Sequence, residues 1–434
     1  MFETLGIFTG IAFLFVSLFV GVPVFAAMGL SGLVGSLFFV DLASLLDSGH
    51  LVWGGLDSFS LLAMPGFVLM GNLYFHHDFG RDLFNAAANW LGHIRGGLVI
   101  AATALGAGFG FICGSAAAGT ATIGSVVIPE VEKRGYDRRL SLGAIAIGGS
   151  LSSLIPPSIV MIIYASLSQT SLGSLFFAGI VPGLILTVLI AAYVYVRAVL
   201  DRSLCPVTPA ASWRDRARSL LSILPVAVAF FVIFGGMYAG VWSAIEAAPI
   251  GAVVAFLTCI AYRRLTWRSL DASIHATLKI CAMVYMIILS AHLLNYFVFV
   301  SKLDRSLVAL VGSLDLPGWA VMSLVLVALT VLGCVFDVMA LIIIATAVYL
   351  PIVELAGYDP VWFGIILVLA CELALITPPV GVNLFIVKDL APADTSTADV
   401  IRGALPYVAL VWVLFAVFIA FPEIVLWLPS ALNH

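Results

Sequence analysis

The sequence predicts an all-α integral membrane protein built from two inverted repeats, each with about five transmembrane helices and one re-entrant helical hairpin. Three observations predict this fold: charged residues are scarce, apolar runs are long, and one short motif recurs in the second half of the chain. Of the 434 residues, 63% are hydrophobic and only 10% are charged, whereas soluble domains carry roughly 25% charged residues. This composition excludes a water-soluble protein.

The charge balance and the cysteines exclude several classes of partner and site. The chain has 19 Lys and Arg against 23 Asp and Glu, a formal net charge of −4, so no basic excess indicates a nucleic-acid partner. The six cysteines show no short spacing, so neither a disulfide framework nor a metal cluster is predicted. No Lys or Arg precedes the first apolar run, which we interpret as a retained membrane span and not as a cleaved signal peptide.

Stretches without charge set the expected membrane crossings. Residues 140–196 contain no Asp, Glu, Lys or Arg. As a helix this stretch would be about 86 Å long, which is enough for two crossings of a ~30 Å hydrocarbon core. The same reasoning predicts further spans at 5–20, 24–40, 58–75, 219–238, 241–262, 276–299 and 403–427, and an interrupted span at 360–387.

The first hairpin is predicted near residues 96–131. The stretch from Gly96 to Pro129 has no charge, and basic residues flank it at Arg95 and Lys133. It is long enough only for two short legs, and its middle is rich in glycine, which is typical of backbone that turns back within a membrane. We therefore expect both basic ends on the same side of the membrane.

The second hairpin is predicted near residues 316–351, where Asp337 is the single interior charge. Ionisable residues at membrane depth are costly and by default functional, so Asp337 is a candidate cation ligand. The alternative is that Asp337 caps the second helix of the hairpin. Glu372, also in an apolar run, either shares the ligand role or bonds to the neighbouring backbone.

The distribution of basic residues predicts the orientation of the chain. With the N-terminus outside, the predicted spans and hairpins place 17 of the 19 Lys and Arg on the inner side and leave only Lys302 and Arg305 outside. This is the bias that the positive-inside rule describes. Both termini are then expected on the outer, periplasmic side of a multi-pass protein.

An internal repeat relates the two halves of the chain. VVIPEVEKRGYD (126–137) and VYLPIVELAGYD (348–359) are identical at seven of twelve positions, and the same 222-residue offset places Pro156-Pro157 on Pro378-Pro379. The first motif continues into a basic loop that is expected inside, whereas the second has no basic residue and is expected outside. The two repeats are therefore predicted to be inverted.

We assign residues 1–218 to repeat one and residues 219–434 to repeat two. Each repeat is expected to contain spans, a hairpin, a broken helix and an amphipathic helix along the membrane surface. The amphipathic helix is predicted at 84–95 on the inner side and at 301–315 on the outer side. Inverted repeats with interrupted helices are typical of secondary transporters.

The paired prolines predict breaks at 154–158 and at 377–383, because proline lacks a backbone N–H and clashes with the preceding turn. Each break leaves carbonyl groups, which suit a cation, and N–H groups, which suit an anion. We expect the first break beside the hairpin tip at Gly114 and Ser115 and the second beside Asp337. Oxygen ligands of this kind suit a hard cation such as Na⁺.

The sequence carries no motif of an enzyme or of an ATP-driven pump. It contains neither G-x-x-x-x-G-K-[ST] nor H-E-x-x-H. His76 and His77 are adjacent and point to different helix faces, so they form no metal-binding pair. We therefore expect no enzymatic activity, no ATP and no metal beyond Na⁺.

Five segments carry a resemblance to a known family. They read AMPGFVLMGNL, GFICGSAAAGTATIGSVVIPEVEKRGYD, GGSLSSLIPPSIVMIIYASLS, GGMYAGVWSAIEAAPIGA and DPVWFGIILVLACELALITPPVGVNLFIV. The chain resembles the large membrane (M) subunit of tripartite ATP-independent periplasmic (TRAP) transporters of the dicarboxylate and sialic acid type. The resemblance implies Na⁺-driven uptake of an organic acid anion across a bacterial inner membrane by an elevator-type motion. It also implies a small four-helix membrane subunit and a periplasmic substrate-binding protein as partners.

The resemblance further implies which residues bind Na⁺ and the substrate. For the glycine and serine residues among them, the alternative role is close packing of membrane helices. For Thr377 and Asn383, the alternative role is to cap the two half-helices. The implied substrate-binding residues are Ser115, Ser158 and Asn383. The implied Na⁺ ligands are Gly114, Ser115, Gly148, Gly149, Ser150 and Pro156 at site one, and Asp337, Thr377, Gly381 and Asn383 at site two.

Two alternatives to a TRAP subunit remain open from the sequence. A self-sufficient divalent-anion/Na⁺ symporter without partner subunits would have the same inverted repeats. A Na⁺ channel or an intramembrane enzyme belongs to a different class, and the missing catalytic constellation disfavours the enzyme. No sequence of the small four-helix subunit is fused to either end, so a separate partner is expected.

Overall fold

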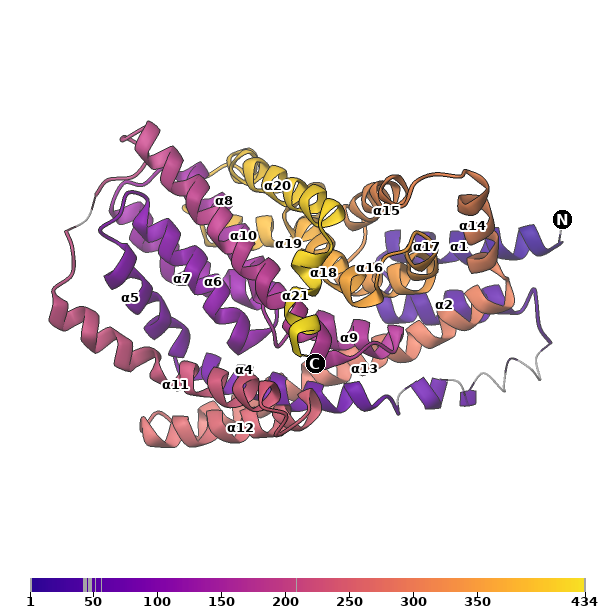
Figure 1. Ribbon diagram of the computed structural model, residues 1–434, viewed down its shortest axis with the longest axis horizontal. Coiled ribbons are helices and arrows are strands. Elements are labelled where there is room, and N and C mark those ends of the chain that lie inside the picture. Colours follow the sequence, from indigo (N-terminus) through magenta and orange to yellow (C-terminus); the bar gives the residue numbers. More distant parts are fainter. Residues whose placement is uncertain are drawn as a thin grey trace.

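The computed structural model describes residues 2–41, 45, 49–50, 52–55, 57–207 and 209–432, and none of these lies in a strand. The chain is a bundle of helices (Figure 1). Their bounds, in chain order, are α1 Phe2–Phe19, α2 Val24–Ser36, η1 Phe59–Leu62, α4 Ala63–His76, α5 Phe79–Leu91, α6 Gly97–Cys113, α7 Ala116–Lys133, α8 Arg138–Leu154, α9 Ile159–Ser168, α10 Leu172–Leu200, α11 Trp213–Tyr238, α12 Ala244–Ala261, α13 Trp267–Val300, α14 Leu303–Ser313, α15 Gly318–Gly333, α16 Val338–Ile344, η2 Ala345–Tyr349, α17 Leu350–Leu355, α18 Pro360–Ile376, α19 Val382–Leu390, α20 Thr397–Ala420 and α21 Glu423–Leu432.

Seven helical segments are long and apolar enough to cross a membrane, or eight if α8 and α9 count as one bent span. The predicted class, an all-helical membrane protein, is confirmed in this respect. The seven segments are Phe59–His76, Leu172–Leu200, Trp213–Tyr238, Ala244–Ala261, Trp267–Val300, Val338–Leu355 and Thr397–Ala420.

Each predicted hairpin is present as two helices that meet at a short break. α6 and α7 pack against each other, and only Gly114 and Ser115 separate them. Gly114 has a φ of +59°, a left-handed conformation that favours glycine and reverses the chain here. In the second hairpin, residues 334–337 separate α15 from α16, which continues through η2 into α17.

Both predicted helix breaks are present at the paired prolines. α8 ends at Leu154 and α9 begins at Ile159, with a bend of 44° between them. α18 ends at Ile376 and α19 begins at Val382. In both breaks the bond between the two prolines is cis.

The span predicted near 403–427 is present, but it lies at Thr397–Ala420 and ends earlier than expected. α20 ends at Ala420, and a separate helix, α21, begins at Glu423. Pro422 explains the difference: it disfavours the helical conformation at the preceding residue, and Phe421 accordingly adopts φ −133° and ψ 72°.

The surface helices and one repeat boundary also differ from the expected positions. α5 occupies 79–91 and not 84–95, and it begins directly after a turn at Asp78, whose φ is +60°. α14 lies within the predicted 301–315. The boundary drawn between residues 218 and 219 falls inside α11, which begins at Trp213.

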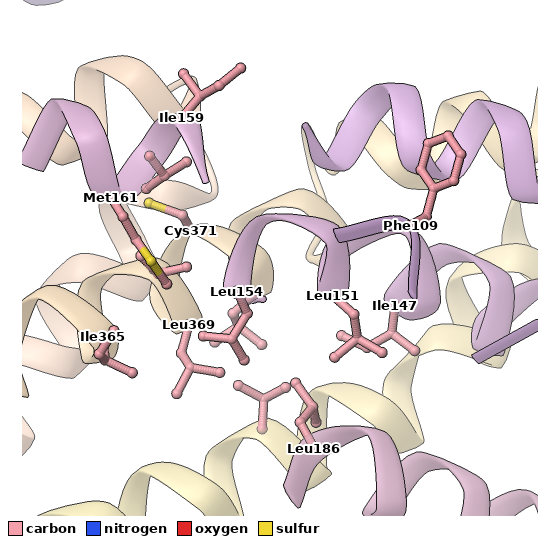
Figure 2. Close-up of a cluster of buried hydrophobic side chains, with 14 of the residues drawn as sticks. Phe109, Ile147, Leu151, Leu154, Ile159, Met161, Leu186, Ile365, Leu369 and Cys371 are labelled. Atoms are coloured by element: carbon pink, nitrogen blue, oxygen red, sulfur yellow. The ribbon is translucent and has the colours of Figure 1, made fainter. Parts of the chain in front are cut away.

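The broken helices form the centre of the molecule. Every residue of α8 from Leu140 to Leu154 is buried, and so is every residue of α18 from Trp362 to Ile376. A helix that is covered on all sides belongs to the core. Figure 2 shows Leu154 of α8, Leu369 of α18 and Leu186 of α10 in one apolar cluster.

Candidate functional site

The two hairpin tips and the two helix breaks border one cavity of about 140 Å³. From the sequence, these elements were predicted to form two separate sites. In the structure, both sets of elements line the same cavity. The lining residues are Gly114, Ser115, Ala116, Ala117, Ser153, Ile159, Val160, Asp337, Val338, Met339, Leu375 and Val382.

The tip of the first hairpin is docked on the first break by backbone contacts. The Ile159 N–H donates to the Gly114 carbonyl at 3.5 Å, and the Ser152 hydroxyl donates to the Ser115 carbonyl at 3.0 Å. A methyl group at Gly114 would lie 2.6 Å from the Pro157 carbonyl oxygen. The expected contact between this tip and the first break is therefore present.

The other residues implied for site one lie deeper in α8, apart from Pro156 in the break itself. Gly149 packs directly on the hairpin, because a methyl group there would lie 1.9 Å from the Thr120 Oγ1. A methyl group at Gly106 would lie 1.9 Å from the Gly148 carbonyl oxygen. The geometry thus gives Gly148 and Gly149 a packing role, and their role as cation ligands stays a prediction.

Asp337 caps a helix and also lines the cavity, and its role as a cation ligand stays a prediction. Its Oδ2 accepts a hydrogen bond from the Met339 N–H at 3.1 Å, so it caps α16. It also lines the cavity and forms no ion pair with any described residue. A capping carboxylate keeps lone pairs free, and these are available to a cation in the cavity.

Thr377 and Gly381 shape the second break and do not line the cavity. The Thr377 hydroxyl donates to the Leu373 carbonyl at 2.6 Å and so ties down the end of α18. Gly381 has a φ of +39° and starts α19. Their neighbours Leu375 and Val382 are the residues that reach the cavity wall.

Asn383 and Ser158 are fully buried, and neither borders the cavity. The Asn383 amide Nδ2 donates to the Ser150 Oγ at 2.8 Å and to the Ala146 carbonyl at 3.3 Å, which links the start of α19 to α8. The Ser158 Oγ accepts from the Met161 N–H at 3.5 Å as the cap of α9. Of the three predicted substrate-binding residues, only Ser115 lines the cavity.

Glu372 is the residue to which the sequence analysis gave too little weight. It is the one acidic side chain among the described residues that is buried, at 0% exposure. The Ser153 hydroxyl donates to its Oε1 at 3.5 Å, and its Oε2 has no partner in the described part of the chain. Since Ser153 lines the cavity, Glu372 lies one side chain away from it.

The repeat offset would have drawn attention to Glu372. It lies 222 residues after Ser150, so the two occupy equivalent positions in the two halves. Ser150 contacts Asn383 of the second half, and Glu372 contacts Ser153 of the first half. Both contacts join one half of the chain to the other, and Glu372 places an ionisable side chain where α18 contacts α8.

The oxygen atoms at this site fit a hard monovalent cation. The Asp337 carboxylate lines the cavity, and Glu372, whose Oε2 has no hydrogen-bond donor in the described structure, contacts the cavity-lining residue Ser153. Carboxylate, amide and hydroxyl oxygens are the ligands of such ions. Among the described residues, no group of three or more His, Cys, Asp or Glu side chains could hold a metal ion.

A helical membrane protein with two hairpins, two broken helices and a small central cavity between them has the architecture of a secondary transporter. The class is confirmed by comparison with known proteins. The chain belongs to the family described as "Tripartite ATP-independent periplasmic transporter, DctM component", whose model matches residues 11–424. The resemblance inferred from the sequence is thereby confirmed.

Curated relatives match over almost their full length. The chain is 33% identical over 408 residues to the C4-dicarboxylate TRAP transporter large permease protein DctM of Pseudomonas aeruginosa, covering 94% of each chain. It is 32% identical to the ectoine/5-hydroxyectoine TRAP transporter large permease protein UehC of Ruegeria pomeroyi, covering 95% of this chain and 96% of the relative. It is 29% identical to the 2,3-diketo-L-gulonate TRAP transporter large permease protein YiaN of Escherichia coli, covering 94% and 95%.

Two solved transporters share the fold at low sequence identity. The YdaH transporter of Alcanivorax borkumensis superposes with a TM-score of 0.63 at 16% identity, over 89% of this chain and 91% of that one. MtrF of Neisseria gonorrhoeae superposes with a TM-score of 0.61 at 13% identity, over 88% and 85%. These likenesses concern the fold alone.

Proposed function

We propose that this chain is the membrane-embedded transport subunit of a Na⁺-coupled importer of organic acid anions, with a C4-dicarboxylate, sialic acid or a related carboxylate as substrate. The observation that carries the proposal is the cavity bordered by both hairpin tips and both helix breaks. The family membership and the names of the C4-dicarboxylate and diketogulonate relatives support the substrate class.

The chemistry around the cavity supports binding of a cation and an anion close together. Asp337 supplies a carboxylate for the cation, and the N-terminal ends of α7 and α9 supply N–H groups for a substrate carboxylate. A bound cation lowers the electrostatic cost of the substrate's negative charge, and the substrate does the same for the cation. This mutual stabilisation is the physical basis of coupled transport.

Transport then proceeds by an elevator-type motion of the hairpins and broken helices in two inverted repeats. A small four-helix membrane subunit and a periplasmic substrate-binding protein complete the transporter in the bacterial inner membrane, with both termini of this chain periplasmic. The 222-residue sequence offset and the helix breaks at both proline pairs support the repeat arrangement.

Reconstitution in liposomes tests the proposed function. The chain, its co-purified small subunit and the binding protein are supplied with radiolabelled succinate or sialic acid under an inward Na⁺ gradient. We expect saturable uptake that stops when K⁺ replaces Na⁺ or when the binding protein is omitted. Uptake that is independent of Na⁺ would contradict the proposed coupling. Uptake by this chain alone would favour the self-sufficient symporter.

A further inference from the structure

Six of the 19 Lys and Arg residues gather in two short segments that the transport cavity does not involve. One segment is the start of α11 and the other is the junction of α12 and α13, and the two form what we call the arginine patch. In Figure 1, α5, the start of α11 and the end of α12 lie at the same end of the molecule. The patch consists of Arg214, Arg216, Arg218, Arg263, Arg264 and Arg268.

Side-chain contacts hold the two segments of the patch together around α5. The Tyr262 hydroxyl donates to the Leu221 carbonyl at 3.1 Å and so ties the end of α12 to α11. Arg264 forms an ion pair with Asp82 of α5 at 2.7 Å. Arg216 lies 5.8 Å from the Trp90 ring of α5 and 5.1 Å from the Trp213 ring. The contacts with α5 and between α11 and α12 therefore fix the positions of the two segments relative to each other.

Most of the positive charge in the patch is unneutralised. Arg214, Arg218, Arg263 and Arg268 are exposed, and the described structure gives their guanidinium groups no ion pair. The acidic residue next to them, Asp215, accepts a hydrogen bond from the Ser212 hydroxyl at 2.6 Å within the cap of α11. Four guanidinium groups are thus free to bind an anion from outside the chain.

Exposed apolar side chains continue directly from the patch along the same helices. Trp213 and Trp267 are 75% and 87% exposed, which is typical of tryptophans at the boundary between membrane and water. One to three turns further along α11 and α13, Leu221 and Leu278 are 64% and 61% exposed. A ligand that fits both surfaces has an apolar body beside the leucines and an anionic group beside the arginines.

We propose that the arginine patch binds the headgroup of an anionic phospholipid. Guanidinium groups bind phosphate oxygens in a bidentate manner, and basic pockets between transmembrane helices suit anionic headgroups. The acyl chains lie along the exposed leucines of α11 and α13, and the anionic headgroup binds the exposed arginines at the ends of these helices. The bound lipid anchors α5, α11, α12 and α13 in the membrane.

Native mass spectrometry of the purified full chain tests this proposal. The protein in detergent is offered phosphatidylglycerol, cardiolipin or phosphatidylcholine, and retained lipid is measured. The test variant combines Arg214→Gln, Arg218→Gln, Arg263→Gln and Arg268→Gln. The control variant removes four other exposed and unpaired charges through Lys133→Gln, Lys302→Gln, Arg305→Gln and Arg402→Gln.

We expect the wild type and the control variant to retain the anionic lipids in preference to phosphatidylcholine. The test variant should bind the anionic lipids at least about tenfold more weakly than the wild type does. Replacing the same four arginines by lysine keeps the charge but loses the bidentate hydrogen bonds, so it should restore only part of the binding; this partial recovery separates a lost site from a misfolded protein. Equal retention of anionic and zwitterionic lipid by the wild type would overturn the proposal. Equal retention of the anionic lipids by the test and control variants would overturn it as well.

Discussion

Glu372 poses the sharpest question at the scale of single residues. A buried carboxyl group in a membrane protein is costly to maintain, and here one of its two oxygens has no hydrogen-bond partner in the described structure. Its contact with Ser153 connects it to the cavity wall. We infer that its charge contributes to binding of the coupling cation.

The substitution Glu372→Gln tests this contribution. It removes the charge and keeps the size of the side chain, so we expect the Na⁺ concentration for half-maximal uptake to rise about tenfold, which corresponds to ~1.4 kcal/mol. The matched control is Glu354→Gln, because Glu354 is exposed in α17. Identical Na⁺ activation curves for the wild type and Glu372→Gln would refute the inference.

Asp337 allows its two functions to be separated by one conservative substitution. Asn caps helices about as well as Asp, so Asp337→Asn should leave thermal stability nearly unchanged. It removes the carboxylate from the cavity, so we expect the Na⁺ dependence of uptake to weaken, and Thr377→Ala should act in the same direction. If both variants keep the wild-type Na⁺ activation curve, the assignment of the second site is wrong.

Gly149 illustrates close packing between a hairpin and a broken helix. In Gly149→Ala the new methyl group would lie 1.9 Å from the Thr120 Oγ1, and we expect a loss of about 1–3 kcal/mol. The control is Gly235→Ala in α11, where a methyl group meets nothing within 4 Å. Thermal unfolding in detergent should show a lower midpoint for Gly149→Ala only; equal midpoints would contradict the packing described here.

At the scale of elements, ion pairs connect the start of α8 with the loop before α20 and the start of α20. Arg138 at the start of α8 lies 2.8 Å from Glu132 and 2.7 Å from Asp394, and Arg139 lies 2.7 Å from Asp399. Asp394 lies in the loop before α20, and its hydrogen bond from Arg138 lowers the pKa of its carboxyl.

The lowered pKa of Asp394 predicts how this contact depends on pH. A carboxyl whose pKa is lower in the folded state stabilises the protein above its unfolded pKa, which is about 3.9, and loses this effect as the pH falls through the folded value. We therefore expect the wild type to unfold at a higher temperature than Asp394→Asn at pH 7, and the two to converge only as the pH falls through the lowered pKa of Asp394, below the unfolded value of about 3.9. A difference that persists at low pH would show that the ion pair is not its cause.

The sequence predicted elements well where glycine or proline determines the backbone. The hairpin tip at Gly114 and the breaks at the two proline pairs lie where expected, because a left-handed turn and a missing N–H act locally. The same reasoning applied to Pro422 would have divided α20 from α21. The start of α5 was missed because the positive φ of Asp78 has no strong local signal.

The meeting of distant segments in one cavity could not be predicted from the sequence. The contact of Asn383 with Ser150 and that of Glu372 with Ser153 join residues more than two hundred positions apart. Such pairs depend on how α8, α18 and α19 cross, and an apolar pattern without a polar face leaves that rotation undetermined. The repeat offset alone linked Glu372 to Ser150.

At the scale of the whole molecule, the central claim is that one cavity couples a cation to an organic anion. The two hairpin tips line this cavity from different halves of the chain, so we expect occupancy of one tip to affect the other. Coupling of this kind requires that both ligands move together. A leak of either ligand alone would mean that the tips act separately.

The most direct test measures the two fluxes in the same liposomes. Radioactive sodium and radiolabelled succinate are followed together in the complete transporter, with Asp337→Asn as the comparison. We expect that succinate entry brings Na⁺ in a fixed ratio and that the substitution lowers both fluxes together. Succinate uptake without accompanying Na⁺, or a Na⁺ flux that does not respond to succinate, would contradict it.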